Sequence, residues 1–134
     1  MHPGGKLGAL LKTVRDMMHT GDAIPLAPLG TRMSDALIEM TRKGLGCVGI
    51  VDANNLLVGI ITDGDLRRHM RNDLLDSRVE DIMTRSPKTV RPDQLISETL
   101  EILNSRKVTA LFAIEDQRPV GIIHVHDLLR AGAA

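Results

Sequence analysis

The 134-residue sequence has no tryptophan or tyrosine and a single phenylalanine, Phe112. Proteins that bind single-stranded nucleic acid usually stack the bases on aromatic side chains, and this chain has almost none. Its 17 basic residues are balanced by 17 acidic ones, so it also lacks the basic field that attracts a phosphate backbone. Nucleic acid is therefore not an expected partner.

Cys47 is the only cysteine, so the chain forms no internal disulfide. It lies in the apolar run "CVGIV", which predicts a small buried core residue, and a chain without disulfides fits a reducing cytoplasm. No apolar run approaches the roughly 18 residues of a membrane span, and the first residues lack the basic start and cleavage site of a signal peptide. The sequence predicts a soluble cytoplasmic protein without a membrane partner.

What the sequence does contain is a repeat. "GIITDGDLRR" at 59–68 returns as "GIIHVHDLLR" at 121–130, "MSDALIEM" at 33–40 as "ISETLEIL" at 96–103, and "VRDMM" at 14–18 as "VEDIM" at 79–83. The spacing drifts only slightly along the chain, as expected where loops change length and structural elements do not. The chain reads as a tandem duplication, with repeat 1 at 14–74 and repeat 2 at 75–134.

Each repeat predicts the same elements in the same order. "AIPL" and "KTV" favour a short strand. The mostly polar segments "DANN" and "EDQR" lie between "CVGIV" and "LVGII" and between "ALFAI" and "PVGII", as in antiparallel hairpins. A short helix follows each "GII". The helix between the first strand and the hairpin is predicted by apolar residues at helical spacing: Met33, Ala36, Leu37 and Met40, then Ile96, Thr99, Leu100 and Leu103.

The predicted fold is therefore α/β, of the α+β type, with two strand-helix-strand-strand-helix units. One three-stranded sheet with two helices leaves an apolar face uncovered. We expect the two units to pack face to face with pseudo-twofold symmetry, as one compact module with two related clefts between them.

Thr62 and Asp65 follow the hairpin of repeat 1 at capping-box spacing. A threonine at the N-cap with an acidic residue three positions later satisfies free helix N–H groups, so capping alone explains both residues. Repeat 2 keeps the aspartate as Asp127 but has His124 in place of the threonine, a poor substitute for a capping hydroxyl. A structural and a ligand-binding role therefore both stay open.

The passage "GIITDGDL" resembles the most specific local pattern of the CBS domain, and residues 14–131 resemble a tandem CBS pair, or Bateman module. The resemblance implies a nucleotide between the repeats, with Asp65 and Asp127 accepting hydrogen bonds from sugar hydroxyls and Thr62, His124 and His126 near the phosphate. It also implies walls built from Ile24, Pro25, Gly46, Cys47 and Val48 in repeat 1, and Lys88, Thr89, Thr109, Ala110 and Leu111 in repeat 2.

A narrower likeness lies at both ends of the chain. "HPGGKLGALLKTVRDMMHTGDAIP" and the final "GIIHVHDLLRAG" resemble the C-terminal part of the KpsF/GutQ sugar isomerases, the arabinose 5-phosphate isomerases of the Kdo, lipopolysaccharide and capsule pathways. In that family a sugar isomerase (SIS) domain precedes the CBS pair. The likeness implies that residues 1–13 are the join to an SIS domain, and that CMP-Kdo or an adenine nucleotide is the regulatory ligand.

No catalytic set emerges from the residues: the chain has no activated nucleophile, no Gly-rich phosphate loop and, beyond His124 and His126, no candidate general base for isomerisation. His124 and His126 are two positions apart, but they lie at a strand-to-helix corner and only His19 and Asp127 suggest themselves as further ligands, so no metal or required cofactor is expected. The two imidazoles would instead pair with an anionic ligand more strongly as the pH falls.

Two functions remain open at this point. The first is a regulatory module that binds a nucleotide or nucleotide sugar and controls an attached isomerase domain. The second is a ligand-free assembly module, whose CBS helices pair two copies into a homodimer within a parent dimer or tetramer. The fragment itself is not expected to be an enzyme.

Overall fold

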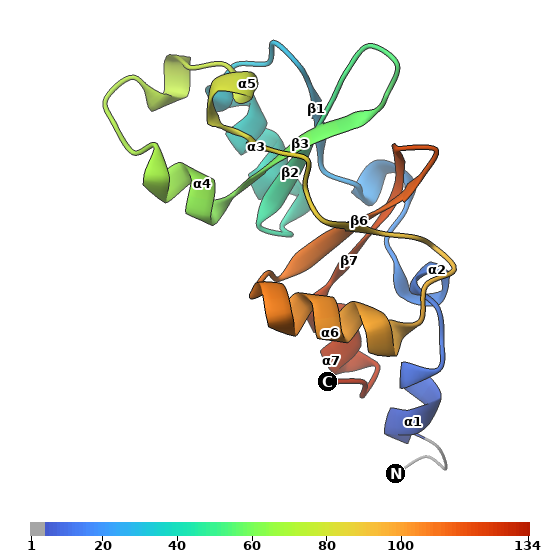
Figure 1. Cartoon of the computed structure of the whole chain (residues 1–134). Helices are drawn as coiled ribbons and strands as arrows, with labels where there is room; N and C mark the ends of the chain where they lie inside the picture. Colours follow the sequence, from blue (N-terminus) through green and yellow to red (C-terminus); the bar gives the residue numbers. More distant parts are fainter. Residues whose placement is uncertain (1–4) are drawn as a thin grey trace. The chain divides into compact units, whose positions relative to one another are not determined.

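The structure is a computed structural model that describes residues 5–134. The chain folds into two compact units (Figure 1). The middle unit comprises Asp22–Pro87, and the terminal unit comprises the residues up to Gly21 together with Lys88–Ala134. The "HPG" of the predicted join to an SIS domain lies outside the described residues.

The middle unit is built around a sheet with strand order β1-β2-β3-β4. Strands β1 and β2 are parallel, and the other neighbours are antiparallel. Its elements are β1 (Leu26–Pro28), α3 (Met33–Lys43), β2 (Cys47–Val51), β3 (Leu57–Thr62), α4 (Asp63–Arg68), the 3-10 turn η2 (Leu74–Asp76), α5 (Val79–Ile82) and β4 (Thr84–Arg85), preceded by the 3-10 turn η1 (Gly21–Ala23).

The terminal unit has the same plan, with strand order β5-β6-β7. The pair β5 and β6 is parallel, and β6 and β7 form an antiparallel hairpin. Its elements are α1 (Gly5–Leu10), α2 (Val14–Met17), β5 (Thr89–Val90), α6 (Ile96–Arg106), β6 (Ala110–Glu115), β7 (Arg118–His124) and α7 (Val125–Arg130).

The predicted α/β fold with two strand-helix-strand-strand-helix repeats is confirmed. The hairpins and closing helices lie where the apolar runs placed them, and the helix stripes face the cores: Met33 and Ile96 are fully buried. The first strand begins three residues later than "AIPL" suggests, because Pro25 has no N–H to donate and serves the sheet only through its carbonyl, which accepts from the Gly49 N–H. The middle sheet also gains a fourth strand, β4, beyond the three expected.

The compact units do not coincide with the sequence repeats, because each repeat's opening segment packs in the unit that holds the other repeat's hairpin. The "VEDIM" segment forms α5, whose Val79 and Ile82 are buried in the core of the middle unit. The "VRDMM" segment forms α2, whose Val14 is buried in the core of the terminal unit. Each sequence repeat therefore depends on the other to complete a core.

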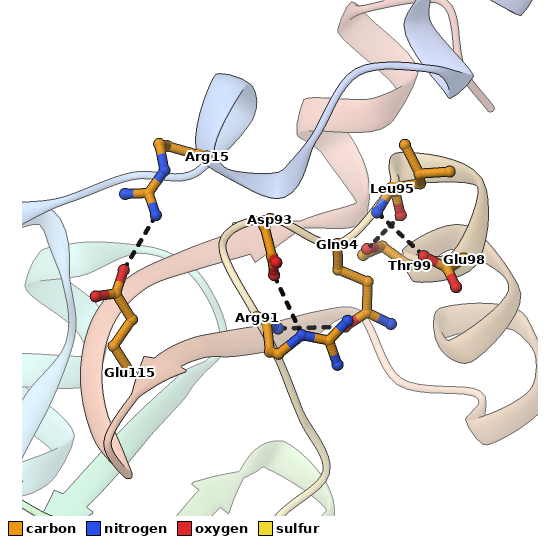
Figure 2. A network of polar contacts seen from close by, with 8 residues as sticks. All are labelled: Arg15, Arg91, Asp93, Gln94, Leu95, Glu98, Thr99 and Glu115. Carbon is orange, nitrogen blue, oxygen red and sulfur yellow. Dashed lines mark hydrogen bonds and ion pairs between the residues drawn. The ribbon is translucent and has the colours of Figure 1, made fainter.

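Backbone hydrogen bonds fix α2 to the loop before α6. The N–H groups of Val14 and Arg15 donate to the carbonyls of Gln94 and Pro92, and Ile96 N–H donates to the Lys12 carbonyl. Figure 2 shows the side chains of this region, among them an ion pair between Arg15 and Glu115. Because both members of that pair are more than half exposed, the backbone bonds and the buried Val14 do most of the anchoring.

The start of α6 is organised by local side-chain bonds, also visible in Figure 2. The Glu98 carboxylate accepts the Leu95 N–H at 3.2 Å, and the Thr99 hydroxyl donates to the Leu95 carbonyl at 3.0 Å. Thr99 is completely buried, so this bond satisfies a hydroxyl that would otherwise be costly in the core. These contacts explain a threonine on the apolar stripe of α6.

A methionine covers a glycine in each unit. A Cβ at Gly59 would lie 2.4 Å from Sδ of Met83 and 3.1 Å from the Thr84 carbonyl oxygen. A Cβ at Gly121 would lie 2.3 Å from Sδ of Met18 and 3.1 Å from the His19 carbonyl oxygen. Residues 14–19 and 79–84 are called the swapped segments below, because each packs in the unit that holds the other repeat's hairpin. The glycines of the two "VGII" strands let these segments approach the sheet closely.

We expect Gly59→Ala and Gly121→Ala each to lower the free energy of unfolding by about 1–3 kcal/mol, the usual cost of overpacking. Urea denaturation followed by far-UV circular dichroism measures the effect. Gly8→Ala in α1 is the matched control, because nothing lies within 4 Å of the added carbon, and alanine favours a helix. Equal stabilities of all three variants would contradict this packing.

Candidate functional site

The buried carboxylate of Asp65 is the centre of a polar cluster in the middle unit, where β3 passes into α4. Its Oδ2 accepts from the Thr62 N–H at 2.9 Å and from the Thr62 hydroxyl at 3.2 Å. Its Oδ1 accepts from the Thr84 hydroxyl at 2.6 Å and from an Arg68 Nη at 2.5 Å. The carboxylate therefore receives four hydrogen bonds, one of them from the swapped segment.

Two opposing effects act on the pKa of Asp65. Burial, the largest single contribution, raises the pKa, whereas the bonds from Thr84, Thr62 and Arg68 together outweigh it, so the pKa is lowered from 3.8. Asp65 is consequently a carboxylate at neutral pH, although it is only 2% exposed. Because a buried charge is tolerated only when it is well paired, these donors are needed to keep it there.

Asp127 occupies the equivalent corner of the terminal unit, between β7 and α7. Its Oδ1 accepts from His19 Nε2 at 2.8 Å and from an Arg130 Nη at 2.6 Å. Its Oδ2 accepts from the His124 N–H at 2.7 Å. His19 thus does in this unit what Thr84 does in the other.

His124 caps α7, contrary to the expectation that it would replace a capping hydroxyl poorly. Its Nδ1 accepts the His126 backbone N–H at 3.1 Å. An imidazole nitrogen accepts only when it carries no proton, so the bond assigns the proton of the neutral ring to Nε2. Burial and then the nearby His126 lower the pKa of His124 from 6.5. The corner therefore favours a neutral His124, not the cation that the sequence suggested for pairing with an anion.

The model of the CBS domain family matches residues 14–72 and 79–134, which is nearly the whole chain and follows the two sequence repeats. The chain belongs to the CBS domain family. It is 47% identical to the arabinose 5-phosphate isomerase KdsD of Pseudomonas aeruginosa over 98% of its own length, and it spans 41% of that relative. The sequence-based identification of a CBS pair that resembles part of these isomerases is confirmed.

Solved structures of CBS pairs share the fold. The CBS pair of MJ0100, in complex with 5'-methylthioadenosine and S-adenosyl-L-methionine, aligns with a TM-score of 0.79 at 23% identity, over 90% of this chain and 94% of that one. CBSX2, in complex with AMP, aligns with a TM-score of 0.77 at 25% identity, over 89% and 94% of the two chains. Adenosine ligands are thus bound by CBS pairs of this architecture.

Within each unit, the residues named as walls of a ligand site gather at the sheet end that holds the aspartate. In the middle unit Cys47 lies opposite Thr62, and in the terminal unit Ala110 lies opposite His124. Six of the ten are buried, namely Ile24, Pro25, Cys47, Val48, Ala110 and Leu111. Gly46, Lys88 and Thr109 are exposed and Thr89 is half-buried. A contact between any of them and a ligand stays a prediction.

Two reactive residue types are placed where their chemistry is restricted. Burial, with a smaller contribution from Asp63, raises the pKa of the Cys47 thiol to about 12, so the thiolate is suppressed as a core residue requires. The rings of His124 and His126 lie 4.6 Å apart. Among residues 5–134, however, no three histidine, cysteine or acidic side chains gather where they would hold a metal ion.

Sequence reasoning missed the two residues that complete the cluster from outside each repeat's hairpin. Thr84 is absent from the predicted site, and His19 belongs to the prediction only as a further metal ligand. A signal for both was present, because His19 follows "VRDMM" as Thr84 follows "VEDIM". The alignment of the repeats therefore equates the two positions, but only the fold shows that each bonds a buried aspartate.

His124 predicts a pH dependence of stability. A histidine whose pKa is lowered in the folded state binds fewer protons there than in the unfolded chain, so stability is fully present above pH 6.5 and is lost as the pH falls through the folded pKa. Protonation at Nδ1 also removes the hydrogen bond that Nδ1 accepts from the His126 N–H. Thermal melts between pH 8 and 5 measure the loss.

His124→Thr restores a capping hydroxyl that does not titrate in this range. The variant should lose less stability than the wild type between pH 7 and 5. His69→Gln serves as the control, because it removes a histidine that lies outside the capped corner at the end of α4. Equal pH dependence in wild type and His124→Thr would contradict the role of the cap.

Proposed function

We propose that this CBS pair is the regulatory part of an arabinose 5-phosphate isomerase, and that it binds a nucleotide or nucleotide sugar whose occupancy controls a preceding SIS domain. The parent enzyme would interconvert D-arabinose 5-phosphate and D-ribulose 5-phosphate in the cytoplasm, on the way to Kdo. The 47% identity to KdsD over nearly the whole chain supports the parent's identity. The complexes of MJ0100 and CBSX2 support an adenosine-type ligand or a related nucleotide.

The observation that carries the regulatory part is the bond between His19 and Asp127. Asp127 sits at the corner where a ligand hydroxyl is expected, and His19 belongs to the segment through which the chain enters the first repeat. A ligand at Asp127 therefore competes with or reinforces a bond to the segment that would lead to the SIS domain. Control of this kind requires only that the ligand prefers one arrangement of His19 over another.

The chain's own residues support binding and not catalysis. The cluster at each corner consists of a carboxylate and its donors, and beyond the histidines of the terminal-unit corner no described base is placed to remove a proton from a sugar phosphate. In the described part of the chain no helix is long and apolar enough to cross a membrane. Isomerisation is accordingly assigned to the proposed SIS domain, and no cofactor is required by the CBS pair.

Dye-based thermal melts test the proposal, because a chain without tryptophan or tyrosine has poor intrinsic fluorescence. The panel is AMP, ATP, CMP, CMP-Kdo and arabinose 5-phosphate. A ligand at 100 times its dissociation constant adds about 2.7 kcal/mol and should raise the melting temperature by roughly 5–15 °C. Arabinose 5-phosphate is the internal control and should leave it unchanged. No shift with any nucleotide would overturn the binding function.

A second candidate, a homodimerisation module, is favoured by one observation on α3. Ile38 is 59% exposed, and it lines a shallow hollow with Leu37, Thr41 and Arg42. The buried stripe of the same helix already packs on the core, so the apolar patch around Ile38 is free to contact another protein surface. We propose that this surface belongs to a second copy of the chain.

Ile38→Asp should convert a dimer into a monomer in sedimentation velocity experiments, because a charge at an apolar contact is costly to bury. Leu29→Asp is the control, since Leu29 is also exposed, at 43%, but lies in the turn after β1. If both variants keep the wild-type oligomeric state, α3 is not the dimer contact.

A further inference from the structure

Helix α1 presents an exposed apolar face. On its inner side Ala9 is buried in the core of the terminal unit, where Leu10 also packs. On its outer side Leu7 is 65% exposed and Leu11 is 63% exposed. The Leu11 N–H donates to the Leu7 carbonyl, so the two side chains lie one helical turn apart on the same face. Single exposed leucines are common on protein surfaces, but two on one turn form a continuous patch.

This face is presented on an ordered element. Helix α1 packs against α6, and directly after α1 the Lys12 carbonyl accepts the Ile96 N–H at 2.8 Å. Val14, at the start of α2, is fully buried. These contacts fix the direction in which the outer face of α1 points. A partner therefore would not have to order α1 when it binds, which lowers the entropic cost of the contact.

The surroundings of the face suit a protein partner. Gly8 lies beside the two leucines, and a Cβ built on it would meet nothing within 4 Å, so a partner can approach the helix closely there. Lys6 and Lys12 are exposed before and after the leucines, and the sequence has no acidic residue before Asp16. Protein interfaces usually combine an apolar centre with a polar rim. The fitting partner surface is therefore an apolar patch bordered by carboxylates.

We propose that the outer face of α1 is the surface on which the SIS domain of the parent isomerase packs. The inference rests on the proposed function, in which that domain precedes the CBS pair. The matched part is 41% of the relative KdsD, so more than half of that protein lies outside it. The four residues before Gly5 can span at most about 14 Å, the length of an extended chain. A domain joined there would be held beside α1 at an effective concentration of about millimolar, so a modest apolar contact is enough for docking.

The test places the same substitutions in this chain and in the parent isomerase. Leu7→Gln combined with Leu11→Gln removes the apolar face, and glutamine favours a helix about as well as leucine. In this chain the double variant should unfold at the same urea concentration as the wild type, because both side chains are already in water. The same measurement shows that the variant is folded.

Hydrogen exchange measured by mass spectrometry reports docking in the parent. The amides of residues 7–12 should exchange about 10- to 100-fold more slowly in the parent than in this chain, the range expected from burying one or two leucines. The double variant should return these amides to the rate seen in this chain. Leu129→Gln is the matched control and should leave the slow exchange unchanged, because Leu129 is 51% exposed in the same unit but belongs to α7.

Three results would overturn this inference. They are equal exchange of α1 in the parent and in this chain, slow exchange that survives in the double variant, and loss of a dimer of this chain in the double variant, which would assign the face to a second copy. None of these measurements involves a nucleotide or isomerisation. If the parent neither binds a nucleotide nor isomerises arabinose 5-phosphate, the proposed function fails, whereas slow exchange that depends on Leu7 and Leu11 still demonstrates docking.

Discussion

A buried carboxylate at the strand-to-helix corner is the interaction on which each unit depends. Asp65 and Asp127 are both buried, and a carboxylate left without hydrogen-bond donors in such a position would cost several kcal/mol. Each therefore has to be supplied with donors from three places: the main chain of the corner, an arginine on the following helix, and the swapped segment. Because the donors come from distant parts of the sequence, the carboxylate holds together parts of the chain that local structure would leave separate.

The swapped segments explain why the chain needs two repeats. Met83 covers Gly59 and Met18 covers Gly121, and beside each contact Thr84 or His19 reaches the aspartate of the same unit. A single repeat, cut at its sequence boundaries, would lack a core helix, the methionine cover and one donor to its buried charge. Two repeats are needed because each one completes the other's aspartate cluster.

The strand-to-helix corners of the two units are built alike, so the position at which they differ shows what the residue there does. Both corners use the same main-chain bond from the N-cap residue to the aspartate, and both use an arginine three residues beyond it. Against this constant background, one exchange, threonine to histidine, moves the capping function from a hydroxyl to a ring nitrogen. It thereby removes one donor from a buried carboxylate and introduces an imidazole whose pKa is lowered from 6.5 by burial.

Periodicity and spacing determined much of this protein by themselves. The α3 stripe, the two hairpins and the Thr62-to-Asp65 cap were predictable because they are set by residues close together in the sequence. The partners of the aspartates were not, since His19 and Asp127 are 108 positions apart. Local sequence patterns do not show which segment packs in which core. The tertiary structure alone decided that the opening segments exchange places, because only folding shows which sheet each segment covers and which buried charge it satisfies.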